Sequence, residues 1–568
     1  MNRTAQLGLL CFFVVAGQLV AADGVPASPE ATEGSGASSG TNNNNAPAIS
    51  SKDIDAMRKQ IAEQEKEIEK LQKAVSAQRE MLETTMRAVS TGGVSTPAGA
   101  PMLVNAAGSG SGILQPVAPA NRVTQDAASA DNPAPLSLKI GDTYITPVGF
   151  MDMTWVTRST NVGSGIGTNF GSIPFNNQAT AAGNVPDNLF TVQNSRIGAR
   201  FDAIMHNTKI LGYWESDFLG FTPTNVAVSS NSDSFRLRLF FVDVQKGQWE
   251  VTGGQTWSLM TPGRSGISPL PGNIFFTNNI DTNYQIGLAW ARQTGVRVTW
   301  HPNDKVAWAL AAEDPQQYGG GSSGGGVITF PSNLPSSMLT QINTGAGNYA
   351  TPALLPDFIT KVAFDPNKSA HIEAAGILTT ARTYNPTTFQ GYTKEGGGFE
   401  FNSNFQVLKN FRVIENFTYG DGIGRYFFGQ APSVILYNTG AAANIRSGGT
   451  VDGVEIQAAK NTALYAYYGG IFAARTTTVD PLTHKPVGYG GAGSSSGNNR
   501  TIQEITFGLQ QTLWRDPKWG GLQFYAQYSY LFRDPWWFAS TSAPRQADTN
   551  MVFLNLRYIL PGAPPKLK

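Results

Sequence analysis

The stretch FEFNSNFQV, residues 399–407, decides the fold class. Apolar side chains at positions 399, 401, 405 and 407 alternate with polar side chains at 400, 402, 404 and 406. Since successive side chains of a β-strand point to opposite faces, this stretch predicts a strand with one apolar and one polar face. The same period of two recurs in EITFGLQQTL, residues 504–513, and in VFLNLRY, residues 552–558.

Similar alternating segments continue from about Leu136 to the C-terminus. They lie near residues 148, 192, 210, 236, 249, 288, 306, 357, 371, 399, 411, 451, 463, 502, 522 and 551, which makes sixteen. The pattern predicts an all-β transmembrane barrel of about sixteen antiparallel strands over residues 136–568.

The connections between these segments are of two kinds. Tight turns are expected at 205–208, 245–247, 301–304, 365–368 and 408–410. Long connections rich in Gly, Ser and Asn are expected at 157–187, 220–234, 258–284, 314–356, 421–449 and 476–500. Short turns at one rim and long loops at the other are typical of outer-membrane barrels, and an even number of strands brings both termini to the periplasmic side.

The composition supports a barrel and excludes other classes. Charged residues make up only 14% of the chain, there are 62 glycines, and aromatics reach 11%. A mean hydropathy of -0.19 excludes a bundle of apolar membrane helices, while a strand-built barrel needs apolar residues only at alternate positions. The net charge of +1 argues against a nucleic-acid partner.

A soluble β-sandwich is the alternative for any single alternating segment. Sandwiches rarely need sixteen strands, do not require a polar interior, and are not usually fringed by aromatic residues. Eight tryptophans are expected near strand ends, as in an interfacial girdle: Trp155, Trp249, Trp257, Trp290, Trp300, Trp514, Trp536 and Trp537.

The N-terminus predicts export. Arg3, an apolar run from Leu7 to Val20 and the small residues before Asp23 fit a signal peptide over residues 1–22. The chain's one cysteine, Cys11, lies within it, so disulfides and cysteine chemistry are excluded from the mature protein. Residues 23–50 and 91–135, rich in small and polar residues, are expected to be flexible linkers.

Between these linkers, residues 51–90 contain dense mixed charge and heptad spacing. The expected coiled-coil core residues are Ile54, Ile61, Ile68, Leu71, Val75 and Leu82. The intervening layers at Gln64, Gln78 and Thr85 are polar, which favours a defined register and number of chains. A single amphipathic helix is the alternative; in either case the segment would be about 60 Å long.

Charged residues in the predicted strands occupy the polar face. Arg196 and Arg200 are opposite Ile197, Ala199 and Phe201, and Arg297 is opposite Val296 and Val298. Arg236 and Arg238 are expected opposite Leu237, Leu239 and Phe241, while Glu215 and Asp217 share one side of the strand between.

These residues form the candidate pore lining, and the pattern allows two interpretations of their role. An arginine ladder opposed by carboxylates would set a transverse field across a constriction. Arginine–carboxylate pairs that brace the wall are the other reading. In the long connection 258–284, Arg264 and Asp281 are candidate lumen charges or anchors of that loop.

The barrel resembles the general outer-membrane porins, and the whole layout resembles the DcaP-like porins. The supporting stretches are SRIGAR (195–200), GYWESD (212–217), FRLR (235–238) and GQTWS (254–258), followed by the long third loop. The resemblance implies a homotrimer of sixteen-stranded channels in outer-membrane lipid with helical extensions in the periplasm, a third loop that narrows the lumen, and dicarboxylate-like solutes. From the residues themselves, sixteen strands with polar interiors and a long third loop predict passive diffusion of small hydrophilic solutes, and the arginine ladder predicts a preference for anions. The coiled coil is expected to project into the periplasm, with the cell wall as its candidate partner.

The sequence supports no catalytic, metal or cofactor site. The four histidines are scattered, and no serine nucleophile has a base at recognisable spacing. Two alternatives to a channel are an enzyme on a barrel scaffold and a structural tether in which the coiled coil is the functional part. Conductance of the purified protein would distinguish a channel from both. One departure from barrel proteins is the tail after Tyr558, since such chains commonly end on an aromatic residue.

Overall fold

The computed structural model describes residues 137–175, 181–220, 234–274, 276–321, 325–344, 353–538 and 547–561. The predicted signal peptide, both linkers, the coiled coil and the last seven residues lie outside these ranges. In the described ranges, no helix is long and apolar enough to cross a membrane.

One antiparallel sheet dominates the described chain. It contains eighteen strands, of which β1 and β3 are short, and the other sixteen are 8 to 19 residues long. The long strands are β2 (Thr143–Arg158), β4 (Arg196–Met205), β5 (Thr208–Asp217), β6 (Arg236–Lys246), β7 (Trp249–Trp257), β8 (Arg292–Asn303), β9 (Val306–Glu313), β12 (Asp357–Asn367), β13 (Ala370–Asn385), β14 (Gln390–Leu408), β15 (Phe411–Asp421), β18 (Arg446–Ala459), β19 (Thr462–Ala473), β22 (Asn499–Asp516), β23 (Gly520–Pro535) and β24 (Ala547–Ile559).

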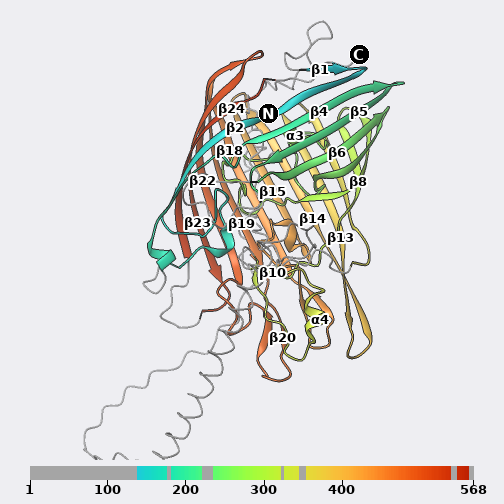
Figure 1. Ribbon diagram of the computed structural model, residues 1–568, viewed down its shortest axis with the longest axis vertical. Coiled ribbons are helices and arrows are strands. Elements are labelled where there is room, and N and C mark those ends of the chain that lie inside the picture. Colours follow the sequence, from blue (N-terminus) through green and yellow to red (C-terminus); the bar gives the residue numbers. More distant parts are fainter. Residues whose placement is uncertain are drawn as a thin grey trace, which may run out of the picture. The chain divides into compact units, whose positions relative to one another are not determined.

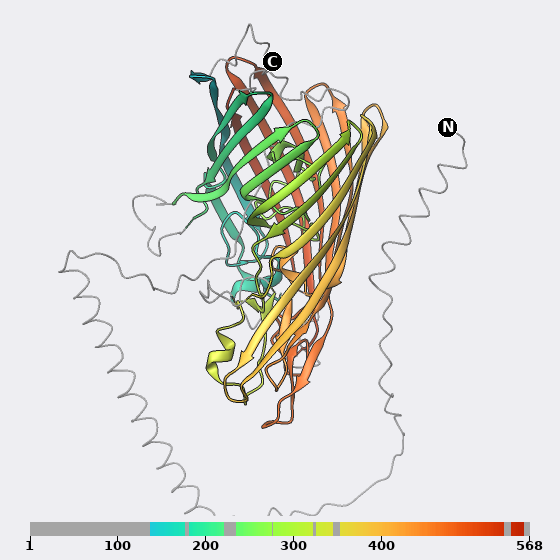
Figure 2. The same cartoon turned by 90° about the vertical axis from the view of Figure 1, so that its right-hand side faces the viewer.

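The sheet closes on itself. Each long strand pairs with its neighbours in sequence, and β24 returns to β2 with Ile559 opposite Phe150. The strands tilt against the long axis, as closure of a barrel requires (Figure 2). The prediction of a sixteen-stranded antiparallel barrel is confirmed.

The two rims differ as predicted. Short turns such as His206–Asn207 and Asp304–Lys305 join strand pairs at the upper rim in Figure 1, beside β1 (Leu138–Ile140). His206 and Asn207 both adopt positive φ, which suits a two-residue hairpin turn. The long connections lie at the lower rim, around α4 (Ser336–Leu339) and β20 (Thr476–Val479).

The long connections contain short elements of their own. These are β3 (Asp187–Thr191), β10 (Gly320–Gly321), β11 (Gly326–Val327), β16 (Val434–Leu436), β17 (Ala442–Asn444), β21 (Pro486–Tyr489), α3 (Pro271–Ile274) and the 3-10 turns η1 (Phe170–Ser172), η2 (Ala181–Asn184) and η3 (Gly424–Tyr426). In Figure 1, β3 pairs with residues 154–158 at the lower end of β2 and β4 pairs with residues 143–150 at its upper end, so together they act as one interrupted strand.

Asp480, in the β20–β21 hairpin, joins two of these connections. Its carboxylate accepts hydrogen bonds from the Ser332 backbone N–H at 2.6 Å and from the Ser332 hydroxyl at 2.9 Å. These bonds, with the N–H groups of Leu482 and Thr483, hold the pKa of Asp480 below its ordinary value. The connection therefore stays intact until strongly acidic pH, because a depressed pKa loses its contribution only as the carboxylate protonates.

Alternation along the strands separates an apolar outer face from a polar inner face. Ile197 and Val296 are about half exposed on the outside, whereas Arg196 and Arg297 are buried inside. Apolar outward and polar inward residues are the pattern of a membrane-spanning barrel.

A β-bulge in β6 corrects one face assignment. The register between β5 and β6 shifts at Arg238, which is left unpaired in the ladder. Because the extra residue reverses the alternation, Leu239 and Phe241 turn inward and are buried, while Leu237 stays outside. The prediction that all three share the outer face was wrong for Leu239 and Phe241.

The tryptophans divide into two groups. Trp249, Trp300 and Trp514 are exposed on the outer face near the short turns, as an interfacial girdle requires. Trp257 and Trp290 are buried, so their assignment to a girdle was wrong. Trp257 is the last residue of β7 and Trp290 lies just before β8. The connection between these strands turns into the barrel, so both rings are buried there.

Two carboxylates interrupt the apolar outer face. Glu415 is the fifth of the eleven residues of β15, and Asp452 is its direct partner on β18. Both lie on the same face as Val413 and Val454 and are only partly exposed. Like charges at opposed positions on a lipid-facing surface are unfavourable.

We predict that replacing both residues, by Glu415→Val and Asp452→Val, stabilises the barrel by on the order of 1 kcal/mol per site. Urea unfolding in lipid vesicles measures the effect, with Val413→Ala on the same face as a control that should destabilise slightly. Marked destabilisation of the double variant would contradict a lipid-facing position for the pair.

Candidate functional site

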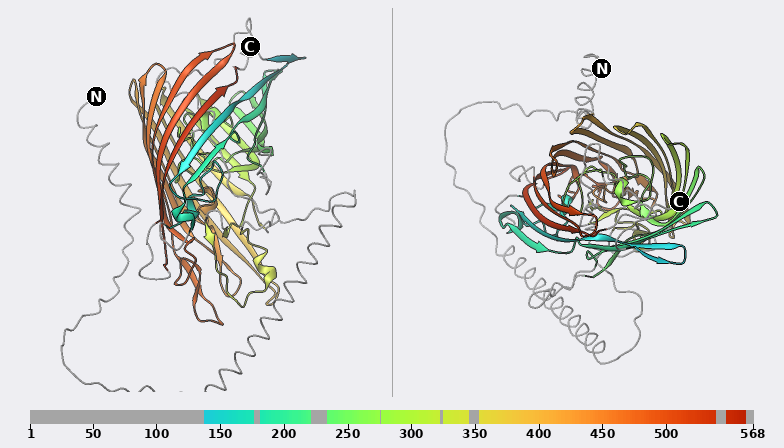
Figure 3. Two further views of the ribbon diagram at one scale, coloured as in Figure 1. Left: turned by 60° about the vertical axis from the view of Figure 1, so that its left-hand side comes forward. Right: turned by 90° about the horizontal axis from the view of Figure 1, so that it is seen from above.

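The connection between β7 and β8, residues 258–291, folds into the barrel and is called the inner loop here. Viewed from above, it lies inside the ring of strands (Figure 3). Residues 276–290 are all buried. The loop was predicted to end at Tyr284; it continues to Ala291, and the strand expected near residue 288 begins at Arg292.

Acidic side chains of the wall hold the first half of the inner loop. The backbone N–H groups of Leu259, Gly263 and Gly266 each donate a 2.7 Å hydrogen bond to a carboxylate. The acceptors are Glu313 of β9, Glu373 of β13 and Asp365 of β12. An ionised acceptor makes such bonds stronger than neutral ones.

The second half is held in the same way by strands farther along the barrel. The N–H of Ile280 donates to Gln527 of β23 at 2.7 Å, and the N–H of Ile286 donates to Glu504 of β22 at 3.2 Å. The inner loop therefore contacts the wall over a wide arc, from β9 to β23.

Arg264 is the strongest ionic anchor of the inner loop. Its two terminal nitrogens contact both oxygens of Glu455 on β18, at 2.6 and 2.9 Å. Glu455 also accepts hydrogen bonds from the Tyr467 hydroxyl at 2.8 Å and the Asn278 amide at 3.1 Å. Of the two roles expected for Arg264, this geometry is that of an anchor.

Asp281 joins the inner loop to the first long connection. Both its oxygens lie 3.2 Å from the Thr168 backbone nitrogen, and the Asn283 amide donates to the Thr168 carbonyl at 2.8 Å. Gly167 makes the approach possible, since a Cβ there would lie 2.6 Å from the Thr282 hydroxyl. Asp281 is thus also an anchor.

Backbone packs directly on backbone where the inner loop reaches β18 and β19. A Cβ on Gly469 would lie 1.9 Å from the Ile286 carbonyl, and a Cβ on Gly287 would lie 2.1 Å from the Thr450 carbonyl. Gly287 has a φ of +91°, which favours glycine. Neither position admits a side chain without moving the loop.

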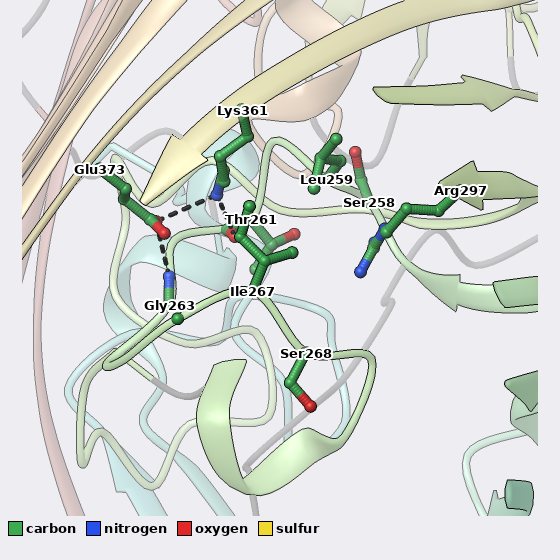
Figure 4. Close-up of a pocket in the computed structure, with 10 residues that line it drawn as sticks. Ser258, Leu259, Thr261, Gly263, Ile267, Ser268, Arg297, Lys361 and Glu373 are labelled. Atoms are coloured by element: carbon green, nitrogen blue, oxygen red, sulfur yellow. Dashed lines mark hydrogen bonds and ion pairs between the residues drawn. The ribbon is translucent and has the colours of Figure 1, made fainter. Parts of the chain in front are cut away.

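Figure 4 shows a small cavity between the start of the inner loop and the strands β8, β12 and β13. Lys361 donates to the Thr261 carbonyl at 2.9 Å and to Glu373 at 3.0 Å. Arg297 lines the opposite side and donates to the Trp257 carbonyl at 2.8 Å. Arg297 therefore lies behind the inner loop.

On the part of the wall that precedes β7, the strands β4, β5 and β6 bring predicted charges into one cluster. In the register, Arg196 and Arg236 both flank Asp217. Arg236 and Arg238 each contact Asp217 at 2.7 Å, and Arg238 also contacts Glu215 at 2.7 Å. The carboxylates lie between the arginines on one wall, as the bracing interpretation has them, and not across the lumen as in the opposed ladder.

The remaining predicted charges take separate places. Arg196 contacts Glu215 at 3.3 Å, while Arg200 lies nearer the short turn that follows β4 and pairs with Asp202 at 2.7 Å. The structure thus gathers Arg196, Glu215, Asp217, Arg236 and Arg238, and separates Arg200, Arg264, Asp281 and Arg297 from them.

The water-accessible charge in these pairs is mainly positive. The side chain of Arg236 is 21% exposed and that of its partner Asp217 is 0%. The corresponding values are 16% and 7% for Arg200 and Asp202, and 11% and 3% for Arg264 and Glu455. In each of these three pairs the arginine side chain is more exposed than the carboxylate side chain, whereas in the His371–Asp365 pair the carboxylate is the more exposed, at 23% against 2%.

Sequence reasoning missed several residues of this region. The anchoring carboxylates Glu313, Glu373, Glu455 and Glu504 were not singled out, although each is on the inner face of a strand. Alternation could have indicated that face but not the loop atoms that they meet. Arg292 was not singled out either, although it begins the strand expected near residue 288.

Comparison with known proteins supports the fold. No family model and no curated protein matches this chain. The outer-membrane channel DcaP of Acinetobacter baumannii matches with a TM-score of 0.52 and 15% identity, over 74% of this chain and 99% of that chain.

Two more distant structures are an anion-selective porin from Comamonas acidovorans and Salmonella typhi OmpF in complex with daunomycin. They have TM-scores of 0.41 and 0.39 and identities of 10% and 9%; each match covers 74% of this chain and 100% of the other. The fold implied by the resemblance to DcaP-like porins is therefore confirmed by the DcaP structure.

We predict that Arg264→Gln destabilises the barrel by about 3 kcal/mol, because Glu455 would be left buried without its cation. The exposed pair Arg446–Asp421, with side chains 55% and 47% exposed, supplies the control. Arg446→Gln should cost less than about 1 kcal/mol. Urea unfolding in vesicles compares the two, and equal effects would show that Arg264 is not an anchor.

Proposed function

We propose that this protein is an outer-membrane porin through which small hydrophilic solutes diffuse passively, with a preference for anions. The observation that carries the proposal is a closed barrel with an apolar outer face and a polar lumen, crossed by an inner loop. A closed barrel satisfies all backbone hydrogen bonds in lipid and leaves a lumen for passage.

The preference for anions rests on which charges meet water. Glu215, Asp217, Glu455 and Glu504 are buried, whereas Arg200 and Arg236 are partly exposed. A pore lined by exposed guanidinium groups attracts anions. Bracing and selectivity are compatible here, because a guanidinium can contact a buried carboxylate with one edge and water with another.

Dicarboxylate-like solutes are the class that the resemblance to DcaP-like porins suggests. Two negative charges would be attracted to successive arginines along the lumen, of which Arg236 and Arg200 are the exposed examples on adjacent parts of the wall. A porin of this kind requires no cofactor and no catalytic residue.

The proposed assembly is a homotrimer in outer-membrane lipid, with residues 51–90 as a periplasmic coiled coil. The support is the heptad pattern with polar layers, which favours a defined number of chains. The cell wall is the proposed partner of the projecting helices.

Purified protein in a planar bilayer should give stepwise conductance, and a salt gradient should give a reversal potential on the anion side. Arg236→Gln should reduce the anion preference, because it removes the most exposed guanidinium of the cluster while Arg238 still contacts Asp217. Arg446→Gln, which alters an exposed pair at the end of β18, is the matched control and should leave selectivity unchanged.

A barrel that never conducts would contradict the proposed channel. That result would favour the tether alternative, in which the barrel is only an anchor. An unaltered reversal potential in Arg236→Gln would contradict Arg236 as the origin of the anion preference, while the channel function would stand.

Deletion of residues 51–90 should weaken the trimer, since it removes the predicted coiled coil while leaving the barrel strands intact. Mass photometry or native electrophoresis of the detergent-solubilised protein measures the assembly. Replacement of the same segment by a flexible linker of equal length is the control for spacing. If the trimers of both variants were as stable as those of the wild type, residues 51–90 would not contribute to assembly.

A further inference from the structure

Arg292 is the first residue of β8, at the point where the inner loop rejoins the wall. In the register it is opposite Trp257, and its guanidinium carbon lies 5.7 Å from the centre of the Trp257 ring. The guanidinium of Arg238 is 5.8 Å from the same ring. Arg292 therefore belongs to the charged cluster of β4, β5 and β6, although none of those strands carries it.

The cluster contains more positive than negative charge. Four guanidiniums, those of Arg196, Arg236, Arg238 and Arg292, surround two carboxylates, those of Glu215 and Asp217. The carboxylates are within ion-pair distance of the first three arginines. Over the described ranges, Arg292 makes no ion pair, and its Nη1 is buried without a hydrogen-bond partner.

An unpaired guanidinium in such a place is costly. Arginine stays protonated in proteins, so it cannot relieve burial by losing its charge. Arg236 and Arg238 each repel it more strongly than Asp217 attracts it. The fold itself does not compensate for this charge, but a bound anion would.

The geometry of a guanidinium group favours a carboxylate as the bound anion. Its parallel N–H donors match the two oxygens of a carboxylate. Arg292 is partly exposed, so a solute can reach it, and the side chain of Arg236 in the same cluster is 21% exposed. The Trp257 ring supplies a flat surface that keeps the guanidinium oriented.

We propose that Arg292, assisted by Arg236, forms a binding site for the carboxylate group of a small organic acid. The proposal rests on the proposed channel function and deepens it, by naming the residue at which a permeating anion pauses. Arg292 is then a specificity residue, whereas Arg238 is a positioning residue that holds Glu215 and Asp217.

The test uses the purified full-length protein and acetate as the probe, with acetamide as its neutral isostere. Acetate should raise the thermal unfolding temperature of the wild type saturably at constant ionic strength, and acetamide should not. In Arg292→Gln the acetate effect should weaken at least tenfold in apparent affinity, while Arg292→Lys should keep part of it.

A second readout separates binding from a structural role. Without any probe, Arg292→Gln should be at least as stable as the wild type, because a charge that Arg236 and Arg238 repel is removed. Arg238→Gln should be less stable, because it leaves two buried carboxylates short of a partner. Equal acetate effects in the wild type and Arg292→Gln, or a strongly destabilised Arg292→Gln, would overturn the proposal.

The outcome is independent of conduction. A conducting channel in which acetate gives no protection would retain the proposed function and lose the site. Protection by acetate in a barrel that does not conduct would retain the binding site and contradict the proposed channel function. Protection by phosphate but not by acetate would overturn the assignment to carboxylates.

Discussion

A backbone segment that crosses the inside of a barrel must find a partner for its N–H groups, and this requirement organises the lumen. The inner loop has little regular structure of its own, apart from the short α3. The wall therefore supplies acceptors, and at Leu259, Gly263, Gly266 and Ile286 the acceptor is a carboxylate. Where the carboxylate has a cation beside it, as Glu373 has Lys361 at 3.0 Å, the hydrogen bond is stronger than one to a neutral acceptor.

This use of carboxylates has a consequence for the charge of the lumen. Several acidic side chains that face the inner loop are shielded from water by it: Glu455 and Glu504 are buried, while Asp365 remains 23% exposed. Arginines are longer and can brace a carboxylate while part of the guanidinium remains accessible, as Arg236 does. A wall with nearly balanced charge can thus present a mainly positive surface to solutes.

Sequence alone predicts those features that repeat locally. Alternation identified the barrel, the number of its strands and the inner position of Arg196 and Arg297, because each depends on a period of two. The bulge at Arg238 broke that period by one residue, and Leu239 and Phe241 were assigned to the wrong face. Contacts across the lumen have no local signature: Arg264 and Glu455 are 191 positions apart.

The most direct test of this account is the water accessibility of the lumen carboxylates in the unaltered protein. Carbodiimide labelling of the folded barrel, read by mass spectrometry, measures it residue by residue. Glu455 and Glu504 should remain unmodified under conditions that label Asp421, whose side chain is 47% exposed. Labelling of Glu455 and Glu504 at the rate of Asp421 would contradict the account, because the lumen would then present negative as well as positive charge to solutes.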